Sequence, residues 1–457
     1  MKKIFALTLV LAMVFGLCAC GESETKTAEN LKVGYAKVNI TPQQLGCGLD
    51  GYSDAETRKA ETLIDYVYTT CVAVSSGEET ILMITFDSCS ANLSVQKEIR
   101  GAVSLALGIS DEKIFIGATH THSAPNKGDG SQAMLNEWCV EAAKKAIADQ
   151  SPATMLAAKP EFPGMNFVRH YQNDDGTYVG SNFGYWGNLV RHATETDPNG
   201  VLVKFDRGED KKDILMVNWQ AHPDDARSIG YNSIAAGWIG PLRDKLESLC
   251  GMHVAYFTGA SGNQNKDSKI ESEAHGLAWR EYGEKMGELI NEALPQLQPV
   301  EGAALKTSRA IVEVDINHAW DHMLKEANEV YELWKSTDKE TGDKLGKTYD
   351  FSSVYQARAI RTCAAKGKSE RLEINAFSIG DIGFTTGTYE MFSDAALFVK
   401  RNSPFETTFL ITGNSGYIPT ENAYKEYRCY ESDTGLYAAG TAEKLADKYV
   451  EMLTAIK

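Results

Sequence analysis

Two histidines separated by one residue form the pattern in this sequence that most strongly suggests chemistry. His120 and His122 lie in the segment THTHSAP, directly after the apolar run Ile114–Ala118. Residues two positions apart in extended backbone project to the same side, so both imidazoles can face one metal ion or one substrate. If the apolar run is a strand of an α/β sheet, the pair lies at its carboxyl end, where such sheets bind ligands. The location favours a functional site over two surface histidines.

A third histidine and a glutamate occupy similar positions. His222 follows the apolar run Ile214–Trp219, and Glu390 follows the run Ile382–Thr386. A catalytic zinc ion takes about three protein ligands and keeps one position for water, so these side chains are candidates. A single histidine such as His222 is equally consistent with a buried or capping role. We expect Glu390 to open a helix over Glu390–Val399, where the helix dipole favours a carboxylate without any metal.

The elements that must position these residues alternate along the chain. Apolar and β-branched runs predict strands at Val33–Ile40, Tyr68–Val74, Ile81–Phe86, Ile114–Ala118, Val201–Phe205, Ile214–Trp219, Val254–Thr258, Ile311–Ile316, Leu372–Ile379 and Thr407–Ile411. Helical periodicity predicts helices at Leu93–Leu107, Gln132–Ala148, Leu242–Leu249, Ala274–Leu294, Asp321–Trp334, Glu390–Val399 and Thr441–Leu453. The alternation predicts an α/β fold. Residues 164–200 lack a period and predict a long functional loop system, and no internal repeat is visible.

The composition restricts the class of protein. Of the 457 residues, 43% are hydrophobic and 24% are charged, as in soluble globular proteins. The net charge is −16 at pH 7. Because a nucleic-acid-binding protein needs clustered Lys and Arg against the phosphates, this charge argues against nucleic acid as a partner.

The N-terminal residues resemble an export signal. A charged start at Met1–Lys3 precedes an apolar run too short to span a bilayer. The run ends at Leu17–Cys20, which resembles the lipobox of bacterial lipoproteins, whose cysteine is lipidated after cleavage. We therefore expect residues 1–20 to be a lipoprotein signal peptide, residues 21–30 a flexible tether and residues 31–457 the catalytic domain. Cys20 would carry the lipid that anchors the exported protein to the membrane; an ordinary secretory signal is the alternative.

The remaining cysteines do not predict a metal site of thiolates. Nine cysteines minus Cys18 and Cys20 leave seven, an odd number at wide spacings and without a C-x-x-C pair. Most of the seven are expected to be buried as small hydrophobic residues.

Taken in order, four segments resemble the neutral/alkaline ceramidase family over nearly the whole exported chain. Gly34–Pro42 resembles the opening strand of the family, and Thr119–Pro125 is similar to its T-H-T-H-S-G-P motif, with Ala124 in place of the usual glycine. Phe257–Asn263 resembles a glycine-rich turn, and Gly416–Glu431 is similar to the late tyrosine segment, with a spacing one residue longer. The resemblance implies a mixed sheet flanked by helices in a single large catalytic domain.

The resemblance also implies a set of site residues. It assigns a Zn²⁺ ion to four ligands and the scissile amide to three polar partners: His120, His222, Glu390 and Tyr417 for the metal, and His122, Arg169 and Tyr430 for the amide. The assignment of Arg169 is based on the segment Asn166–Arg169, which has two more residues between Asn and Arg than the Asn-Arg step of the family. The alternative is that Arg169 is a solvated cation in a loop. Tyr427 competes with Tyr430. The implied reaction is hydrolysis of a ceramide-like N-acylated lipid, with imidazole ligands favouring zinc.

The sequence also differs from the family. The family's C-terminal immunoglobulin-like domain is not expected here, since the chain ends at Lys457. The substrate can equally be a smaller amide or an ester.

Three other classes of protein remain open at this point. A TIM-barrel amidohydrolase also uses a His-x-His pair. A serine hydrolase is a weaker match, because the residues around Ser261 do not form a G-x-S-x-G elbow. A lipid-anchored solute-binding protein would need no metal at all.

Overall fold

The first of three similar structural units consists of one sheet and two helices. The computed structural model describes residues 31–52, 58–126, 131–180, 185–270, 276–336 and 339–457, so the expected signal peptide, lipobox and tether lie outside the described residues. The elements of unit 1 are β1 (Leu31–Asn39), β3 (Tyr68–Ser76), β4 (Glu79–Phe86), α1 (Leu93–Leu107), β5 (Ile114–Ala118) and α2 (Ser131–Ala148). Its sheet has the order β5-β4-β3-β1-β6, with β6 (Ser151–Pro152) at the edge. β1, β3 and β4 are antiparallel, and the chain then crosses through α1 to place β5 parallel to β4.

The same arrangement occurs twice more. Unit 2 contains β7 (Thr154–Ala158), β12 (Val201–Asp206), β13 (Ile214–Trp219), α4 (Ile239–Cys250), β15 (His253–Thr258) and α5 (Trp279–Ala293), with β17 (Gln298–Pro299) at the edge. Unit 3 contains β18 (Leu305–Asp315), β19 (Ser369–Ile379), β20 (Ile382–Gly387), α9 (Ser393–Asn402), β22 (Thr407–Thr412) and α12 (Thr441–Ile456). In both units three antiparallel strands are followed by a helix and a fourth strand parallel to the third. The protein therefore contains a threefold structural repeat that the sequence does not reveal.

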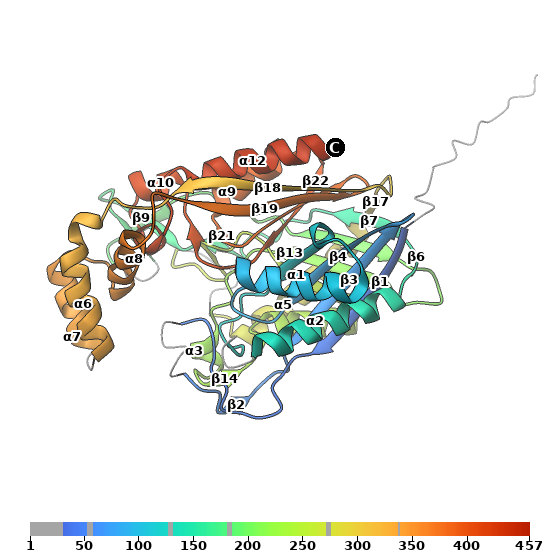
Figure 1. Cartoon of the computed structure of the whole chain (residues 1–457), viewed down its shortest axis with the longest axis horizontal. Helices are drawn as coiled ribbons and strands as arrows, with labels where there is room; N and C mark the ends of the chain where they lie inside the picture. The colour runs from blue at the N-terminus through green and yellow to red at the C-terminus, as the bar shows by residue number, and fades with distance from the viewer. Residues whose placement is uncertain (1–30, 53–57, 127–130, 181–184, 271–275, 337–338) are drawn as a thin grey trace, which may run out of the picture.

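The three sheets bury their inner faces in one shared core. Phe115 of the first sheet stacks on Phe377 of the third, with ring centroids 3.8 Å apart, and Phe257 of the second contacts Phe409 of the third. Each outer face is covered by the two helices of its own unit. Figure 1 shows α1 and α2 over the first sheet and α9 and α12 over the third. Sheets covered on both faces explain why the central strands read as continuous apolar runs.

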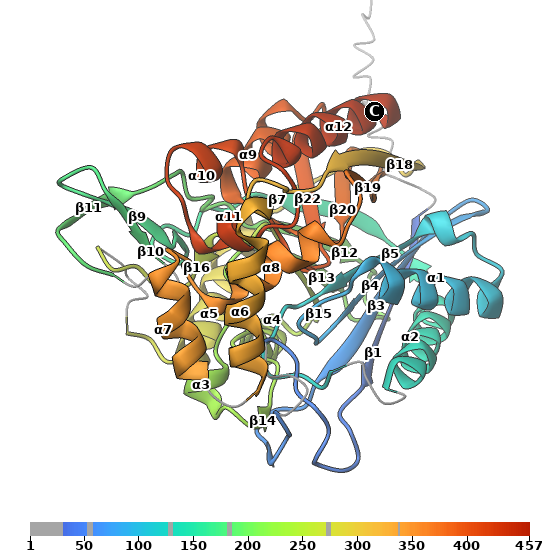
Figure 2. The ribbon, with the colours of Figure 1, turned by 60° about the vertical axis from the view of Figure 1, so that its left-hand side comes forward.

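Each unit carries an insertion between its first and second strands. The first insertion, residues 40–67, contains β2 (Thr62–Leu63). The second, residues 159–200, contains β8 (Phe167–Val168), β9 (His170–Asn173), β10 (Tyr178–Gly180) and β11 (Leu189–His192). The third, residues 316–368, contains η4 (Asp321–Met323), α6 (Leu324–Ser336), α7 (Lys339–Thr348) and α8 (Val354–Ala364), which Figure 2 shows toward the viewer. Residues from all three insertions line one cavity, which is described next.

Short elements complete the chain. They are η1 (Asp111–Lys113), α3 (Ala226–Ile229), β14 (Ser233–Ile234), β16 (Gln264–Asn265), η3 (Leu294–Gln296), β21 (Glu390–Met391), β23 (Tyr417–Ile418), α10 (Glu421–Lys425) and α11 (Tyr430–Thr434). Within the described residues, no helix is both long enough and apolar enough to cross a membrane.

The α/β class with mixed sheets flanked by helices is confirmed, and all ten predicted strands are present. Two local predictions are wrong. Glu390 does not open a helix, because its backbone pairs with Tyr417 between the parallel strands β21 and β23, and the helix begins only at Ser393. Residues 164–200 are not irregular throughout, since β10, β9 and β11 form a small sheet. The mixed sheets also exclude the TIM barrel, which needs parallel strands alone.

Cysteine burial agrees in large part with the prediction. The seven cysteines in the described part of the chain are free, and Cys71, Cys139, Cys363 and Cys429 are buried. Cys89 is different, because it lies beside the histidines of the candidate site.

Candidate metal centre

The seven residues implied as a site line one cavity of about 540 Å³. Residues far apart in sequence meet there because carboxyl strand ends from all three units point to the same region. His120 follows β5 of unit 1, His222 follows β13 of unit 2, and Glu390 follows β20 of unit 3. The site is thus assembled by the threefold arrangement of the units.

The side chains of His120, His222 and Glu390 converge on one point. The Nε2 atoms of His120 and His222 are 3.1 Å apart, and Oε2 of Glu390 lies 3.3 Å from Nε2 of His120. Tetrahedral ligands at about 2.0–2.1 Å from zinc would be about 3.3 Å from one another, so this spacing matches a metal site. Oε2 of Glu390 is buried and has no hydrogen-bond partner among the described residues, which is costly unless a cation binds it.

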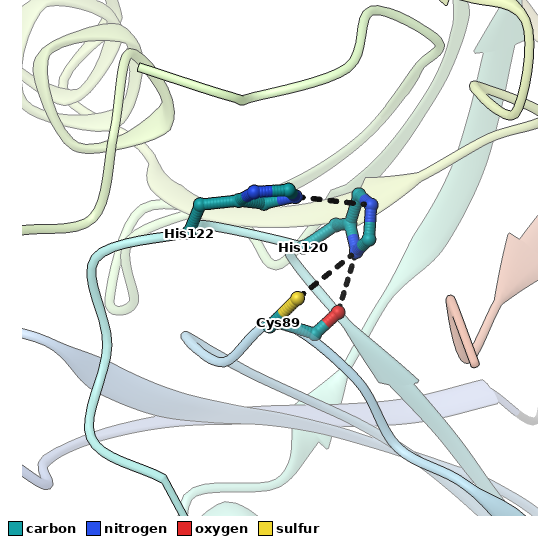
Figure 3. A group of neighbouring side chains, drawn as sticks. All are labelled: Cys89, His120 and His122. Carbon is teal, nitrogen blue, oxygen red and sulfur yellow. Dashed lines mark hydrogen bonds between the residues drawn. The ribbon is translucent and has the colours of Figure 1, made fainter. Parts of the chain in front are cut away.

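Backbone carbonyls orient both imidazoles. Nδ1 of His120 lies 2.5 Å from the carbonyl oxygen of Cys89, as Figure 3 shows, and Nδ1 of His222 lies 3.3 Å from that of Ser261. A carbonyl oxygen only accepts, so each Nδ1 carries the proton and each Nε2 presents its lone pair to the centre. His120 also adopts a φ of 69°, a left-handed conformation that is uncommon outside glycine and costs energy.

Two glycines allow close packing around the centre. A Cβ on Gly51, whose φ is 110°, would lie 2.7 Å from Cα of His122. A Cβ on Gly262 would lie 2.9 Å from the carbonyl oxygens of Glu390 and Met391, and the Gly262 amide donates to the latter. The glycine-rich turn after β15 therefore supports the strand that carries Glu390.

His122 lies at the same centre. Its Nε2 atom is 3.3 Å from Nε2 of His222 and 3.5 Å from Nε2 of His120. Its Nδ1 atom is 3.5 Å from Oδ1 of Asp224, whose other neighbour is the hydroxyl of Tyr52. Burial lowers the pKa of His122, but Cys89 and Asp224 outweigh it and raise the pKa above its usual value. The ring is well placed to hold and release a proton.

Arg169 is buried and reaches Tyr417. Its Nη2 atom donates to the Tyr417 hydroxyl at 3.2 Å and to the Gly262 carbonyl at 2.8 Å. Glu431 holds the guanidinium at 2.5 Å and also contacts Nε2 of His170 at 2.7 Å. Burial would raise the pKa of Glu431, but Arg169 and His170 hold it well below its usual range. The interpretation of Arg169 as a solvated loop cation is wrong, because only 6% of this residue is exposed.

The structure distinguishes the two competing tyrosines. Tyr430 lines the cavity, and its ring contacts those of Tyr417 and Tyr355. Tyr427 is buried in a separate cluster against His170. Tyr430 is therefore the residue in a position to meet a substrate.

Several cavity residues were not predicted. Cys89, Asp224, Tyr52, Tyr355 and Arg358 line it as well. The position of Cys89 relative to its strand marks it as a site residue, but this position is recognised only once the three units are compared. It lies three residues after the end of β4, as His222 does after β13 and Glu390 does after β20, so the three are equivalent positions of the repeated unit. Its Sγ atom is 3.8 Å from Nδ1 of His120.

Two solved structures share the fold. The neutral ceramidase from Pseudomonas aeruginosa matches with a TM-score of 0.69 and 14% identity, over 93% of this chain and 74% of that one. A ceramidase complexed with C2 matches with a TM-score of 0.69 and 15% identity, over 93% and 75% of the two chains. No family profile matches the sequence. No curated protein sequence matches it either.

The structural match confirms the sequence-based resemblance at the level of the fold. The chain has the fold of the neutral ceramidases although about six in seven aligned residues differ, as the identity of 14% implies. The similarity extends over 93% of the present chain.

Proposed function

We propose that the protein is a zinc-dependent hydrolase that cleaves the amide bond of an N-acylated, ceramide-like lipid. The observation that carries the proposal is the unpartnered, buried carboxylate oxygen of Glu390 beside the converging Nε2 atoms of His120 and His222. The fold shared with two ceramidases supports the reaction class.

The residues present fit a zinc ion. His120, His222 and Glu390 would hold it, with Tyr417 as the fourth ligand implied by the family resemblance. A bound zinc ion supplies hydroxide near neutral pH and polarises a carbonyl. The remaining chemistry belongs to side chains of this chain.

His122 is assigned the proton transfers. Its Nε2 atom faces the centre and can take a proton from the attacking water, then pass it to the nitrogen of the leaving amine. Asp224, near Nδ1, stabilises the protonated ring. Arg169 and Tyr430 are donors for the charge that develops on the carbonyl oxygen.

The proposal is tested by metal content and turnover on one preparation. Protein from residue 31 onward is analysed by mass spectrometry for metals and assayed for release of a fluorescent short-chain acyl group from N-acylsphingosine. About one zinc per chain and release that a chelator abolishes would support the proposal. Zinc without release would support a metallohydrolase that acts on a different substrate, whereas absence of metal would favour a solute-binding lipoprotein.

A second candidate is a metal-dependent amidohydrolase or esterase that acts on a non-lipid small substrate. The side chains around the centre favour it, since Asp50, Asp224, Arg227 and Arg358 bring four charged groups to the cavity. A ceramide, with one long chain on its sphingoid base and another on its acyl group, would instead be expected to meet apolar walls.

Export and lipid anchoring through Cys20 belong to the same proposal. The support is the sequence of residues 1–20. Wild-type protein expressed in a bacterial host should partition into the membrane fraction, and Cys20→Ser should be released into the soluble fraction. Equal partitioning of both forms would contradict the anchor.

A further inference from the structure

A second lobe adjoins the cavity of the metal centre. This lobe has a volume of about 350 Å³ and shares with the first the lining residues Tyr355, Arg358, Ser415, Gly416, Tyr417 and Tyr430. Because Tyr417 lines both, the second lobe lies beside the metal centre. A substrate bound at the centre therefore has this lobe next to it.

Arg358 is the single charged residue among the described residues that line the second lobe. Thr362, Thr434 and Tyr437 add hydroxyl groups to a lining whose surface is otherwise mainly apolar, with Ala359 and Leu436 among its residues. Arg358 also lines the first lobe, where Asp50, Asp224 and Glu390 are among the lining residues, whereas the other residues that line the second lobe are neutral. The lining of the second lobe therefore has one cation and no carboxylate.

The neighbours of Arg358 leave its guanidinium available. It lies over the ring of Tyr355 at 5.6 Å, and no ion pair forms between Arg358 and any residue in the described ranges. On α8 the positions three and four residues away are Val354, Tyr355, Arg361 and Thr362, so the helix offers no carboxylate. Arg361, one turn along, is different: it pairs with Glu332 at 3.2 Å.

The phenols around Arg358 are donors. Tyr430 and Tyr437 both line the lobe, and burial raises the pKa of Tyr437 to about 12, so its hydroxyl keeps its proton. A planar guanidinium with neighbouring hydroxyl donors matches the geometry and charge of a carboxylate.

We propose that the second lobe is an anion subsite in which Arg358 binds a carboxylate of the substrate. This inference rests on the proposed amide hydrolysis and names its substrate class: an N-acylated compound with an acidic group on the amine side, such as an N-acyl amino acid. Ceramide has no such group. An acidic substrate would account for both the polar lining of the first lobe and the single cation of the second.

Binding measurements test the subsite independently of turnover. The probes are N-dodecylsulfonyl derivatives of glycine, 4-aminobutyrate and 6-aminohexanoate, each with its neutral primary amide, so that no bond is cleaved and three spacer lengths are sampled. Calorimetry compares zinc-loaded wild-type protein with Arg358→Gln and Arg361→Gln, the second being a matched control on the same helix. For at least one spacer, wild type should bind the acid roughly tenfold more tightly than the amide, as expected for a charge-assisted hydrogen bond.

The variants decide the outcome. Arg358→Gln should remove the preference for the acid and leave binding of the amide unchanged, whereas Arg361→Gln should behave as wild type. An equal preference in all three proteins, or none at any spacer length in wild type, would overturn the subsite. Hydrolysis of the corresponding dodecanoyl amides is assayed separately. Acid-selective binding without cleavage would support the subsite and contradict the proposed reaction. Cleavage of N-acylsphingosine without acid-selective binding would support the reaction and contradict the subsite.

Discussion

The strand ends and the insertions contribute to the cavity in different ways. His120, His222 and Glu390 follow strands of the three sheets and are 3–5% exposed. Arg169 and Arg358 come from the second and third insertions, which differ completely in structure, one being a small sheet and the other a helical group. The repeated scaffold thus supplies His120, His222 and Glu390, while the three insertions add further side chains to the cavity wall.

We infer from this contrast that metal binding and substrate selection can change separately in this fold. Strand ends are held by sheet hydrogen bonds and by the shared core, so the ligands have little freedom to move. Insertions only need to preserve the strands at their two ends, and they tolerate changes in length and structure. Variants in the two regions should therefore give distinct results.

The largest effect is expected from the ligands themselves. His120→Ala and His222→Ala each remove a nitrogen donor, so both should lose bound zinc and lower activity by about a thousandfold or more. Metal analysis and the hydrolysis assay on the same samples measure this. The insertion variant Arg358→Gln is the control and should retain its metal. A zinc-replete, active His120→Ala protein would show that the centre lies elsewhere.

A His122 variant tests whether this residue binds the metal or transfers protons. Its Nε2 is as close to the other imidazoles as a ligand would be, yet its assigned role is proton transfer. His122→Ala should keep zinc and lower kcat by about 10²–10⁴-fold, which is the range for loss of general acid–base catalysis. Loss of zinc together with activity would move His122 into the ligand set.

Arg169 tests the second insertion. Arg169→Met should retain zinc and lower kcat by about 10²–10³-fold, because a donor to the developing oxyanion is lost. The substitution also removes the guanidinium that pairs with the buried Glu431 carboxylate, which costs stability. The double variant Arg169→Met/Glu431→Gln is the control: it should recover thermal stability without recovering kcat. Recovery of both would reduce Arg169 to a structural role.

Asp225 should affect stability and leave catalysis almost unchanged. Burial raises its pKa from 3.8 to about 6, and Lys266, 3.9 Å away, opposes the shift without cancelling it. Between these pH values the folded protein binds more protons than the unfolded chain, so the unfolding free energy falls as pH rises, by up to about 3 kcal/mol. Asp225→Asn removes this titration.

Urea unfolding of wild type and Asp225→Asn at several pH values measures the effect. The variant should gain stability relative to wild type as pH increases from about 4 to about 7, and the gain should then level off. Parallel stability curves for the two proteins would mean that the pKa of Asp225 is the same in the folded and unfolded states. A gain that grows toward low pH would contradict the sign of the shift.

Much of the scaffold could be predicted from the sequence because its central strands are buried on both faces. Ile114–Ala118 and Ile214–Trp219 agree with the observed strands residue for residue, since continuous apolar runs bounded by polar segments have few other solutions. The insertions gave weaker signals. α8 was not predicted, although it carries Tyr355 and Arg358, because its burial depends on packing against its neighbours α6 and α11.

The α/β class and the His-x-His pair at a strand end could be identified from the amino-acid sequence, because both depend on local periodicity. Family resemblance extended this to Glu390 and Tyr417. The folded structure was needed to establish that Arg169 is buried against Glu431, that Tyr430 faces the cavity and Tyr427 does not, and that Cys89 is equivalent to His222 and Glu390. These facts depend on contacts between distant segments, and a threefold repeat of packing leaves no trace in a sequence whose side chains have diverged.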